Sequence, residues 1–519
     1  MNGRLFQRVL ATQREFVFAR NLVASSFDVQ RSGTRQIQRL LFDTFDHRLR
    51  RAGRFLELDV DGGSRVRLYG AGAEADYVEQ ALITPVPEPF VVTAGPVESA
   101  IQPLLGGRAL LVQCVLCMRI TEFRVIDGEG KFRATLSREQ VIGAVSTGRG
   151  TTLLNVLRLW PLRGYEKSCR RLFAELDAML DDTGTESDPA RKFLALFSKM
   201  QAGAPVNAPV PLRPRQSAAR ALGLILLGQL RILAANVDGI RSDTDSEFLH
   251  DFRIACRRSR SLLTQVRGAF PGRGTASFRD TFAWLSASTS PQRDLDVFLS
   301  ALPVLAARLS GRHERALSPL LDGLVERRRQ AHADLVLTLS GVRFRNFLPD
   351  WRHYLEGFAG RHAPRINSAP YVQDAANDAL RRLHKRLLRD GARCGVGTYS
   401  PVLHELRKEG KKLRYLLEAF RTLYPPGEVD EVLRRLRKLQ GVLGDIVDYH
   451  VQREWLRQWQ QEFLARTGMD PQSLAAMAEL GLELDRLELK AQQGFVRRFE
   501  QFAAEPVRAA MQRLLAGPP

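Results

Sequence analysis

One segment of the chain occurs twice, at a fixed offset of 154 residues. Without a gap, residues 250–297 align with residues 404–451, and ten of the 48 aligned positions are identical. The matched positions include His250 with His404, Arg253 with Arg407, and Arg257 with Lys411. A repeat of this kind indicates a duplicated supersecondary unit, so this half of the chain is expected to fold as two copies of one unit.

The repeated segment predicts an amphipathic helix in each copy, within a half that is all-α. Leucine, alanine, arginine and glutamate dominate this half, and its apolar residues recur with a helical period. At about 100° per residue, offsets of 0, 3, 7 and 10 fall on one face. Each copy therefore carries a cationic stripe: His250, Arg253, Arg257 and Arg260, widened by Arg258, and His404, Arg407, Lys411 and Arg414, widened by Lys408 and Lys412.

These stripes favour an extended anion. Like charges one turn apart destabilise a helix by a few tenths of a kcal/mol per pair, and a bound anion reverses that sign. Arginine offers a bidentate fork to phosphate, lysine a point charge, and histidine a further donor. Two alternatives stay open: each stripe is a solvated face, or the two histidines are buried structural groups. A metal site is disfavoured because the neighbours are cations, and Asp294 and Asp448 are expected to orient basic side chains or cap helices.

The basic charge is concentrated in the half that holds the repeat. Of 77 Lys+Arg and 57 Asp+Glu in the chain, residues 1–190 hold 25 and 23, so nearly all of the net +20 lies beyond residue 190. A proline-rich stretch separates the halves and indicates a semi-rigid linker. The predicted organisation is a first domain at 1–200, a linker at 201–216 and a helical domain at 217–505, with repeats around 217–345 and 371–500.

The first domain is predicted to be α+β. Apolar and polar residues alternate in residues 54–60, 64–69 and 119–125, with glycine-containing turns beside them, which is typical of antiparallel strands. Residues 165–180 indicate a helix. The arginines on these strands are interpreted as exposed charges, with contacts to phosphate as the alternative: Arg65, Arg67, Arg119 and Arg124.

Cysteine usage and hydropathy indicate a protein of the reducing cytoplasm with no membrane partner. Five cysteines in 519 residues make no disulfide framework, and Cys114 and Cys117 are interpreted as two buried strand residues rather than a zinc or redox site. The N-terminus lacks a signal-like apolar stretch, and the most apolar run, residues 221–230, is too short to span a bilayer. No cofactor is expected.

The doubled pattern resembles the conserved-histidine α-helical domain, CHAD. The segments HDFRIACRRSR and HELRKEGKKLRY, followed at a fixed distance by RDLDV and DYHV, carry the likeness over about residues 215–500. The resemblance implies two four-helix bundles related by a pseudo-twofold axis, basic faces around a central pore or groove, and binding of inorganic polyphosphate. The ligand contacts that it implies are His250, Arg253, Arg257, Arg258, Arg260, His404, Arg407, Lys408, Lys411, Lys412, Arg414 and Tyr415. Ile254 and Ser261 stand where the second copy has Lys408 and Tyr415, so the second stripe is expected to bind more strongly.

The first domain is similar to the CYTH or triphosphate-tunnel family. Residues 42–46, FDTFD, followed by Leu49 and Gly53, carry the likeness, and residues 159–172 are similar to the lead-in of that family's terminal helix. The resemblance implies a tunnel of antiparallel strands that hydrolyses triphosphates with metal-binding carboxylates. The family's E-x-E-x-K strand is matched here by residues 15–19, which keep one glutamate, and Glu57 stands where the family has an arginine. We therefore expect a tunnel-like fold that has lost catalysis.

The leading hypothesis is a non-catalytic protein that binds inorganic polyphosphate and associates with polyphosphate granules and their proteins. The alternative is a CYTH-type triphosphate or polyphosphate hydrolase whose CHAD half delivers substrate. Nucleic-acid binding is the least favoured function, because the stripes hold little aromatic surface for base stacking. All three predict salt-dependent affinity. Convergence of both basic faces on one concavity would favour the first.

Overall fold

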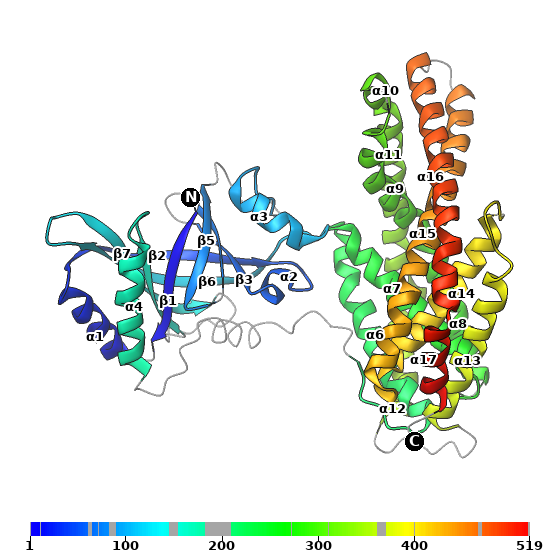
Figure 1. Cartoon of the computed structure of the whole chain (residues 1–519), viewed down its shortest axis with the longest axis horizontal. Helices are drawn as coiled ribbons and strands as arrows, with labels where there is room; N and C mark the ends of the chain where they lie inside the picture. The colour runs from blue at the N-terminus through cyan, green and yellow to red at the C-terminus, as the bar shows by residue number, and fades with distance from the viewer. Residues whose placement is uncertain are drawn as a thin grey trace. The chain divides into compact units, whose positions relative to one another are not determined.

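The computed structural model describes residues 2–10, 12–60, 65–70, 72–81, 90–144, 154–181, 209–270, 272–309, 311–360, 370–398, 400–465 and 470–516. They belong to two compact units, Met1–Val206 and Asn207–Pro519 (Figure 1). The predicted linker lies outside the described residues as far as residue 208. Beyond that point it follows the helical unit: Thr422 Oγ1 accepts from the Leu212 amide at 3.2 Å and donates to the Val210 carbonyl at 2.8 Å.

The first unit is a closed antiparallel barrel, which confirms the predicted tunnel-like α+β fold. Its strands are β1 (Asn2–Leu10), β2 (Asp28–Asp43), β3 (Arg54–Asp59), β4 (Arg65–Gly70), β5 (Glu74–Ala81), β6 (Leu111–Ile126), β7 (Phe132–Ala144) and β8 (Leu154–Pro161). They follow the order β1-β5-β4-β3-β2-β6-β7-β8, and β8 pairs with β1, for example Leu159 with Phe6. The helices of this unit are α1 (Gln13–Ala24), α2 (Arg48–Arg51), α3 (Pro96–Leu105) and α4 (Glu166–Asp181).

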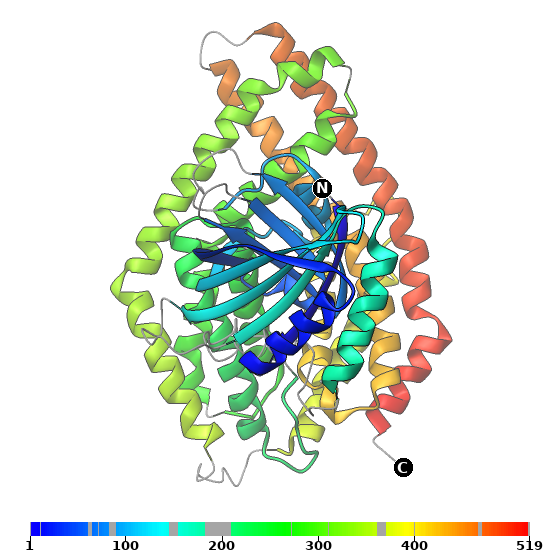
Figure 2. The same ribbon diagram turned by 90° about the vertical axis from the view of Figure 1, so that its left-hand side faces the viewer.

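Alternation along the strands places one set of side chains inside the barrel and the other outside. Leu5, Leu41 and Val156 belong to one interior cluster, while Phe6 packs outside against α1 and α4. Figure 2 shows these two helices, blue and green-cyan, alongside the strands. Cys114 and Cys117 both lie in β6, the first buried and the second half-buried, and neither is bridged.

The expected position of the first strand is wrong. Residues 15–19 lie in α1, because Thr12 caps that helix by accepting from the Glu15 amide at 3.2 Å, and Glu15 suits the positive end of the helix dipole. The first strand is β1 instead. Its interior positions are Leu5, Gln7 and Val9, so β1 supplies no carboxylate to the barrel.

The FDTFD motif builds the turn between β2 and α2. Asp43 Oδ1 accepts from the amides of Thr44 and Leu49 at 2.8 and 2.9 Å, and its Oδ2 accepts from the Arg50 amide at 3.1 Å. Thr44 Oγ1 accepts from the Arg48 amide at 2.9 Å. Every one of these bonds fixes the local backbone, so the motif's role in this chain is structural.

The second unit is all-helical, as predicted. Its first part holds α6 (Ala218–Arg241), α7 (Ser246–Gln265), α8 (Gly272–Ser288), α9 (Ser290–Ala306), α10 (Gly311–Ala316), α11 (Ser318–Ser340) and α12 (Val342–Ala359). Its second part holds α13 (Val372–Gly391), α14 (Ser400–Ala419), the 3-10 turn η1 (Arg421–Leu423), α15 (Pro426–Ala465), α16 (Pro471–Ala503) and α17 (Glu505–Ala516).

The helices repeat at the sequence offset. α7 and α14 start 154 residues apart and have the same length. α6 and α13 also start 154 residues apart. Equivalent residues meet where the two copies begin: Ser217 forms an antiparallel bridge with Tyr371. The Ala218 amide donates to the Pro370 carbonyl at 3.0 Å, and the Val372 amide donates to the Gln216 carbonyl at 2.8 Å. Such reciprocal bonds between equivalent positions are the signature of a pseudo-twofold axis.

The copies differ where a proline interrupts one helix. In the first copy α8 ends at Ser288 and α9 starts at Ser290, with Pro291 in its first turn. The equivalent position in the second copy is Asp445, and there α15 runs unbroken for 40 residues. Proline has no amide to donate, so it suits a helix start and breaks a helix interior.

The apolar run at 221–230 belongs to a helix longer than the run itself. α6 has 24 residues. It is the one helix in the described part of the chain that is long and apolar enough to cross a membrane. More than half of its most apolar window is buried in the helical unit, where Leu222, Leu226 and Leu230 are core residues. These side chains account for its hydropathy.

Candidate functional site: a basic cavity between the two repeats

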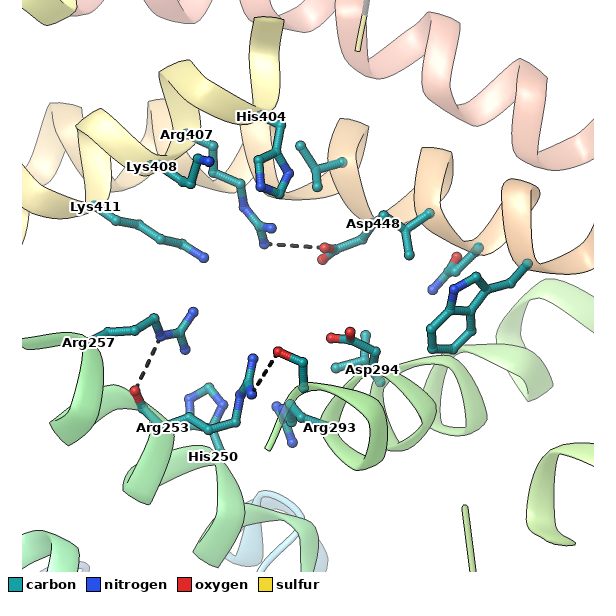
Figure 3. Close-up of a pocket in the computed structure, with 16 residues that line it drawn as sticks. His250, Arg253, Arg257, Arg293, Asp294, His404, Arg407, Lys408, Lys411 and Asp448 are labelled. Carbon is teal, nitrogen blue, oxygen red and sulfur yellow. Dashed lines mark hydrogen bonds and ion pairs between the residues drawn. The ribbon is translucent and has the colours of Figure 1, made fainter. Parts of the chain in front are cut away.

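The two cationic stripes converge on one cavity of about 510 Å³, which we call the basic cavity. It lies between α7 and α9 of the first repeat and α14 and α15 of the second (Figure 3). The lining residues are His250, Arg253, Arg257, Ser290, Arg293, Asp294, Val297, His404, Arg407, Lys408, Lys411, Val447, Asp448, Val451, Gln452 and Trp455. Six cationic side chains thus face two carboxylates, and two histidines lie beside them.

The stripes point inward because the opposite faces of their helices are buried. α7 begins at the N-cap Asp245, which accepts from the amides of Glu247 and Phe248, and it buries Phe252 and Leu262. α14 buries Leu406 and Leu413 in the same way. Burial of each large apolar side chain contributes about 1.5–3 kcal/mol, enough to hold the cationic faces toward each other against their repulsion.

Equivalent residues of the two repeats face each other across the cavity. Arg257 opposes its counterpart Lys411, and Asp294 opposes its counterpart Asp448, closely enough that each pair is electrostatically coupled. Figure 3 shows these side chains directed into the same space from both sides. The pseudo-twofold axis therefore brings like charges together in both pairs. Because six cations face only two carboxylates, the cavity as a whole favours an anionic occupant.

Two equivalent arginines are anchored differently. Arg253 Nη1 donates to the Ser286 carbonyl, Thr289 Oγ1 and Ser290 Oγ at 3.1, 2.7 and 3.2 Å. Glycine replaces Ser290 in the second repeat, and Arg407 instead pairs with Asp448, its Nη2 lying 3.2 Å from Oδ1. Among the described residues, neither Arg253 Nε nor Arg407 Nε has a hydrogen-bond partner. Each arginine is thus positioned by the fold and keeps a buried donor unsatisfied.

The electrostatics of the cavity favour anion uptake. Burial, Arg407 and Arg257 lower the pKa of Lys411 to about 7, against the weaker effect of Asp448. Burial and Arg257 likewise lower the pKa of Arg253 to about 10, and burial and Lys408 lower the pKa of His404. In the described part of the chain no carboxylate pairs with the Lys411 ammonium. A bound phosphate would supply the missing negative charge.

Residues 224–457 match the model of the CHAD domain family. The helical unit contains a CHAD domain. The match begins within α6 and ends within α15, so it includes all four helices of the basic cavity.

Two curated relatives align with part of the chain. An uncharacterized protein found in two strains of Mycobacterium tuberculosis is 28% identical over 223 residues, which cover 42% of this chain and 41% of the relative. The chain therefore spans about two fifths of the length of these curated relatives.

Three solved structures are similar at lower identity. The CHAD domain from Ricinus communis is 21% identical, with a TM-score of 0.47, and covers 60% of this chain and 99% of its own. PptA from Streptomyces chartreusis is 17% identical, with a TM-score of 0.41, and covers 55% and 100%. A Hippeastrum protein described as an adenylyl cyclase with a dominant triphosphatase activity is 13% identical, with a TM-score of 0.25, and covers 39% and 97%.

Five of the predicted contact residues of the CHAD domain lie outside the basic cavity. Arg258 pairs with Glu418 at 2.7 Å, Arg414 lies 3.8 Å from the same carboxylate, and both guanidinium groups lie over the ring of Tyr415, which is buried. Lys412 pairs with Glu409 at 2.6 Å, and Arg260 is exposed one turn beyond the cavity. The structure thus brings together seven of the twelve: His250, Arg253, Arg257, His404, Arg407, Lys408 and Lys411.

The basic cavity also contains residues that were not predicted from the sequence as ligand contacts. Asp448 orients Arg407, as expected of it, and with Asp294 it belongs to the cavity wall. Both were visible as identities between the repeats. Arg293 and Trp455 could not be recognised from the repeat, because their equivalent positions hold Val447 and Ala301.

The barrel holds a second cluster of buried charges, but its members neutralise one another. Arg39 contacts Glu57, Asp59 and Glu139 at 3.3, 2.6 and 2.5 Å. Arg158 contacts Glu57 and Glu139, both at 3.1 Å, and lies 2.9 Å from the Tyr69 hydroxyl. Burial would raise the carboxylate pKa values, yet the arginines outweigh it and lower the pKa of Asp59 to about 2.

The prediction that Arg67 is an exposed strand charge is wrong. Its side chain is 13% exposed and contacts Asp59 at 3.0 Å and Glu79 at 2.5 Å inside the barrel. The outer neighbours Val66 and Leu68 are buried under α2 and α3, so the apolar face of β4 is its outer face. Arg65, Arg119 and Arg124 are exposed as predicted.

Proposed function

We propose that the CHAD domain binds inorganic polyphosphate in the basic cavity. The observation that carries the proposal is the convergence of six cationic side chains from both repeats on one cavity with two carboxylates. A chain of phosphates offers closely spaced charges to this set. Arg253, Arg257 and Arg407 would supply bidentate forks, and Lys408 and Lys411 would supply point charges.

The shape of the site supports polyphosphate over a nucleic acid. A nucleic-acid backbone is usually met by cations spread over an open face with aromatic side chains between them. Here the cations gather in one cavity between four helices. Trp455 is the one aromatic residue among the described residues of its lining, and Tyr415, next to the stripe, is buried under Arg258 and Arg414. As a consequence of polyphosphate binding, the protein is also proposed to associate with polyphosphate granules in the cytoplasm and with the proteins of these granules.

We propose further that the protein is a binding protein rather than a hydrolase. Each barrel carboxylate that could ligate a metal is held by an arginine, and the interior of β1 contributes Gln7 between two apolar residues. No phosphate release is expected from tripolyphosphate or long-chain polyphosphate with Mg²⁺ or Mn²⁺. Metal-dependent phosphate release by the wild-type chain would favour the CYTH-type hydrolase instead.

Neighbouring residues on one helix provide the test of the binding site. Lys411 faces the basic cavity, whereas Lys412 pairs with Glu409 outside it. Lys411→Gln should weaken long-chain polyphosphate binding about tenfold or more, and Lys412→Gln should leave it nearly unchanged, as measured by isothermal titration calorimetry. Arg257→Gln and Arg258→Gln make the same comparison on α7. Equal effects within each pair would mean that binding follows overall charge and not the cavity.

Competition decides between the polyanions. Long-chain polyphosphate should displace a labelled polyphosphate probe at far lower phosphate concentration than single-stranded or double-stranded DNA does, at one fixed salt concentration. A preference for DNA or RNA would contradict the proposal.

A further inference from the structure

A second cavity of about 370 Å³, which we call the aromatic cavity, adjoins the basic cavity. It lies between α9, α11 and α15, and Trp455 lines both cavities. α9 also takes part in both: Ser290 and Asp294 line the basic cavity, while Pro291 and Leu295 line the aromatic one. A ligand held by its phosphates in the first cavity therefore has an aromatic wall within reach.

The aromatic wall is held in place from behind. Trp459, 4% exposed, stacks on Phe298 with 5.8 Å between ring centroids and an interplanar angle of 10°. The Trp455 ring lies 5.8 Å from that of Trp459 and is only half-buried. The Arg327 guanidinium lies 5.1 Å from the Trp459 ring centroid at the edge of the cavity. These groups form a packed aromatic surface with one half-buried indole.

Polar groups line the same cavity. Gln330, Asp334 and Gln458 line the cavity, and Gln330 Nε2 donates to Asp334 Oδ1 at 3.1 Å. The amide oxygen of Gln330, the second carboxylate oxygen of Asp334 and the amide of Gln458 supply both acceptors and donors. An apolar pocket with a few such groups is typical of a site for a flat heterocycle, which needs stacking on its face and hydrogen bonds on its edge.

We propose that the two cavities together bind a purine nucleoside polyphosphate, with its base on Trp455 and its phosphates in the basic cavity. Asp448 marks the position of Arg407, whose Nη2 lies 3.2 Å from its Oδ1, and Trp455 lies seven residues further along α15, about 10 Å along the helix axis. A ribose and a short phosphate chain can cover this span. The inference rests on the proposed function, since the phosphate sites are the same, and it adds a subsite that selects phosphate chains ending in a nucleoside.

The test compares ligands that share a phosphate number. Tripolyphosphate carries more charge than ATP or GTP, so electrostatics alone would make it the tightest of the three. Stacking contributes about 1–3 kcal/mol per base, and we therefore expect ATP or GTP to bind at least about fivefold more tightly than tripolyphosphate. Calorimetry on the full chain gives all three dissociation constants. Tryptophan fluorescence gives a second readout, because the nucleotides should quench it and tripolyphosphate should not.

Variants separate the base subsite from the phosphate sites. Because Trp455 lines both cavities, Trp455→Ala should weaken nucleotide binding more than tripolyphosphate binding and so remove the preference, while Trp455→Phe should keep most of it. Gln330→Ala, at an exposed position, guards against misfolding and should reduce the preference a few-fold. Trp284→Ala is the matched control, because Trp284 stacks under Arg343 and lines neither cavity.

The outcomes distinguish the two proposals. If tripolyphosphate binds and neither nucleotide binds more tightly, or if Trp455→Ala weakens all three equally, this inference fails and the proposed function stands. If none of the three binds although long-chain polyphosphate does, this inference fails and the proposed function stands; if long-chain polyphosphate does not bind either, both fail.

Discussion

Both units bury arginines beside carboxylates, but the balance of charge differs. In the barrel, Arg39, Arg67 and Arg158 share Glu57, Asp59, Glu79 and Glu139, and every member contacts an opposite charge. In the basic cavity, six cations face the two carboxylates of the lining. Lys408 and Arg293 pair with Glu405 and Glu247 outside that lining, and Lys411 has no carboxylate partner among the described residues. The first arrangement is complete within the fold, and the second is not.

Under the proposed function, the barrel cluster stabilises the fold and the basic cavity is completed by a ligand. Moving charges out of water costs several kcal/mol per ion, and opposite charges and hydrogen bonds must offset that cost. The barrel offsets it internally, and its arginines accordingly have raised pKa values. The basic cavity leaves the cost partly unmet, and the pKa values of Lys411 and Arg253 are lowered. The predictions below test this contrast, starting with the largest expected effect.

Breaking the barrel network should strongly destabilise the first unit. Glu57 contacts Arg39, Arg67 and Arg158, so Glu57→Gln leaves buried guanidinium groups without their shared carboxylate. The unfolding free energy of the barrel should fall by about 3–5 kcal/mol in urea titrations. The control is Glu122→Gln, which removes the exposed pair with Arg35 and should cost less than about 1 kcal/mol. A loss as small as the control's would mean that the network is not what stabilises the barrel.

Polyphosphate affinity should fall as the pH rises through 7. The ligand-free pKa of Lys411 is about 7, and bound phosphate would raise it, so binding above pH 7 requires uptake of a proton. The affinity should then fall by up to about tenfold per pH unit between pH 7 and 9. Long-chain polyphosphate suits this titration because only its end groups change charge there. Lys411→Arg should flatten the profile and Lys412→Arg should not; a flat wild-type profile would contradict the prediction.

Removing the charge of Lys411 should stabilise the ligand-free helical unit. Because its folded pKa lies below the ordinary 10.5, the unfolded chain binds more protons between these two pH values, and the stability contribution of this lysine rises with pH. The cost of the buried ammonium is therefore full below pH 7 and shrinks toward pH 10.5. Lys411→Met should raise the unfolding free energy by on the order of 1 kcal/mol at pH 6 and by less at pH 9. An equal gain at both pH values would exclude this origin.

The sequence predicted the cavity well because two periodicities determine it. The helical period decides which residues share a face, and the offset of 154 residues makes the two faces equivalent, so their convergence follows from pseudo-twofold packing. The length of the stripe in use could not be predicted. Arg260 and Arg414 share the face of His250 and His404, yet the neighbouring helices enclose only the first two turns.

The barrel was predicted less well because alternation identifies faces and not which face is inside. On β4 the apolar positions Val66 and Leu68 are covered from outside by α2 and α3, so the polar face with Arg67 turns inward. In a sheet with one face on the core and the other in solvent, the apolar face of β4 would have turned inward and Arg67 outward. Residues 15–19 alternate in polarity too weakly to separate a strand from the capped helix that they form.

The asymmetry between the two stripes makes the finest test of the comparison. Lys408 has Ile254 as its counterpart, lines the basic cavity, is 47% exposed and pairs with Glu405 on its own helix. Because solvent screens its charge, Lys408→Ile, which gives the second stripe the residue of the first, should weaken polyphosphate binding only about two- to fivefold. The converse change, Ile254→Lys, should strengthen it by a similar factor if the stripes act as equivalent halves of one site. If Lys408→Ile lowered polyphosphate affinity as much as Lys411→Gln, the exposed Lys408 would contribute as much to binding as Lys411. That result would contradict the expectation that Lys411 makes the larger contribution.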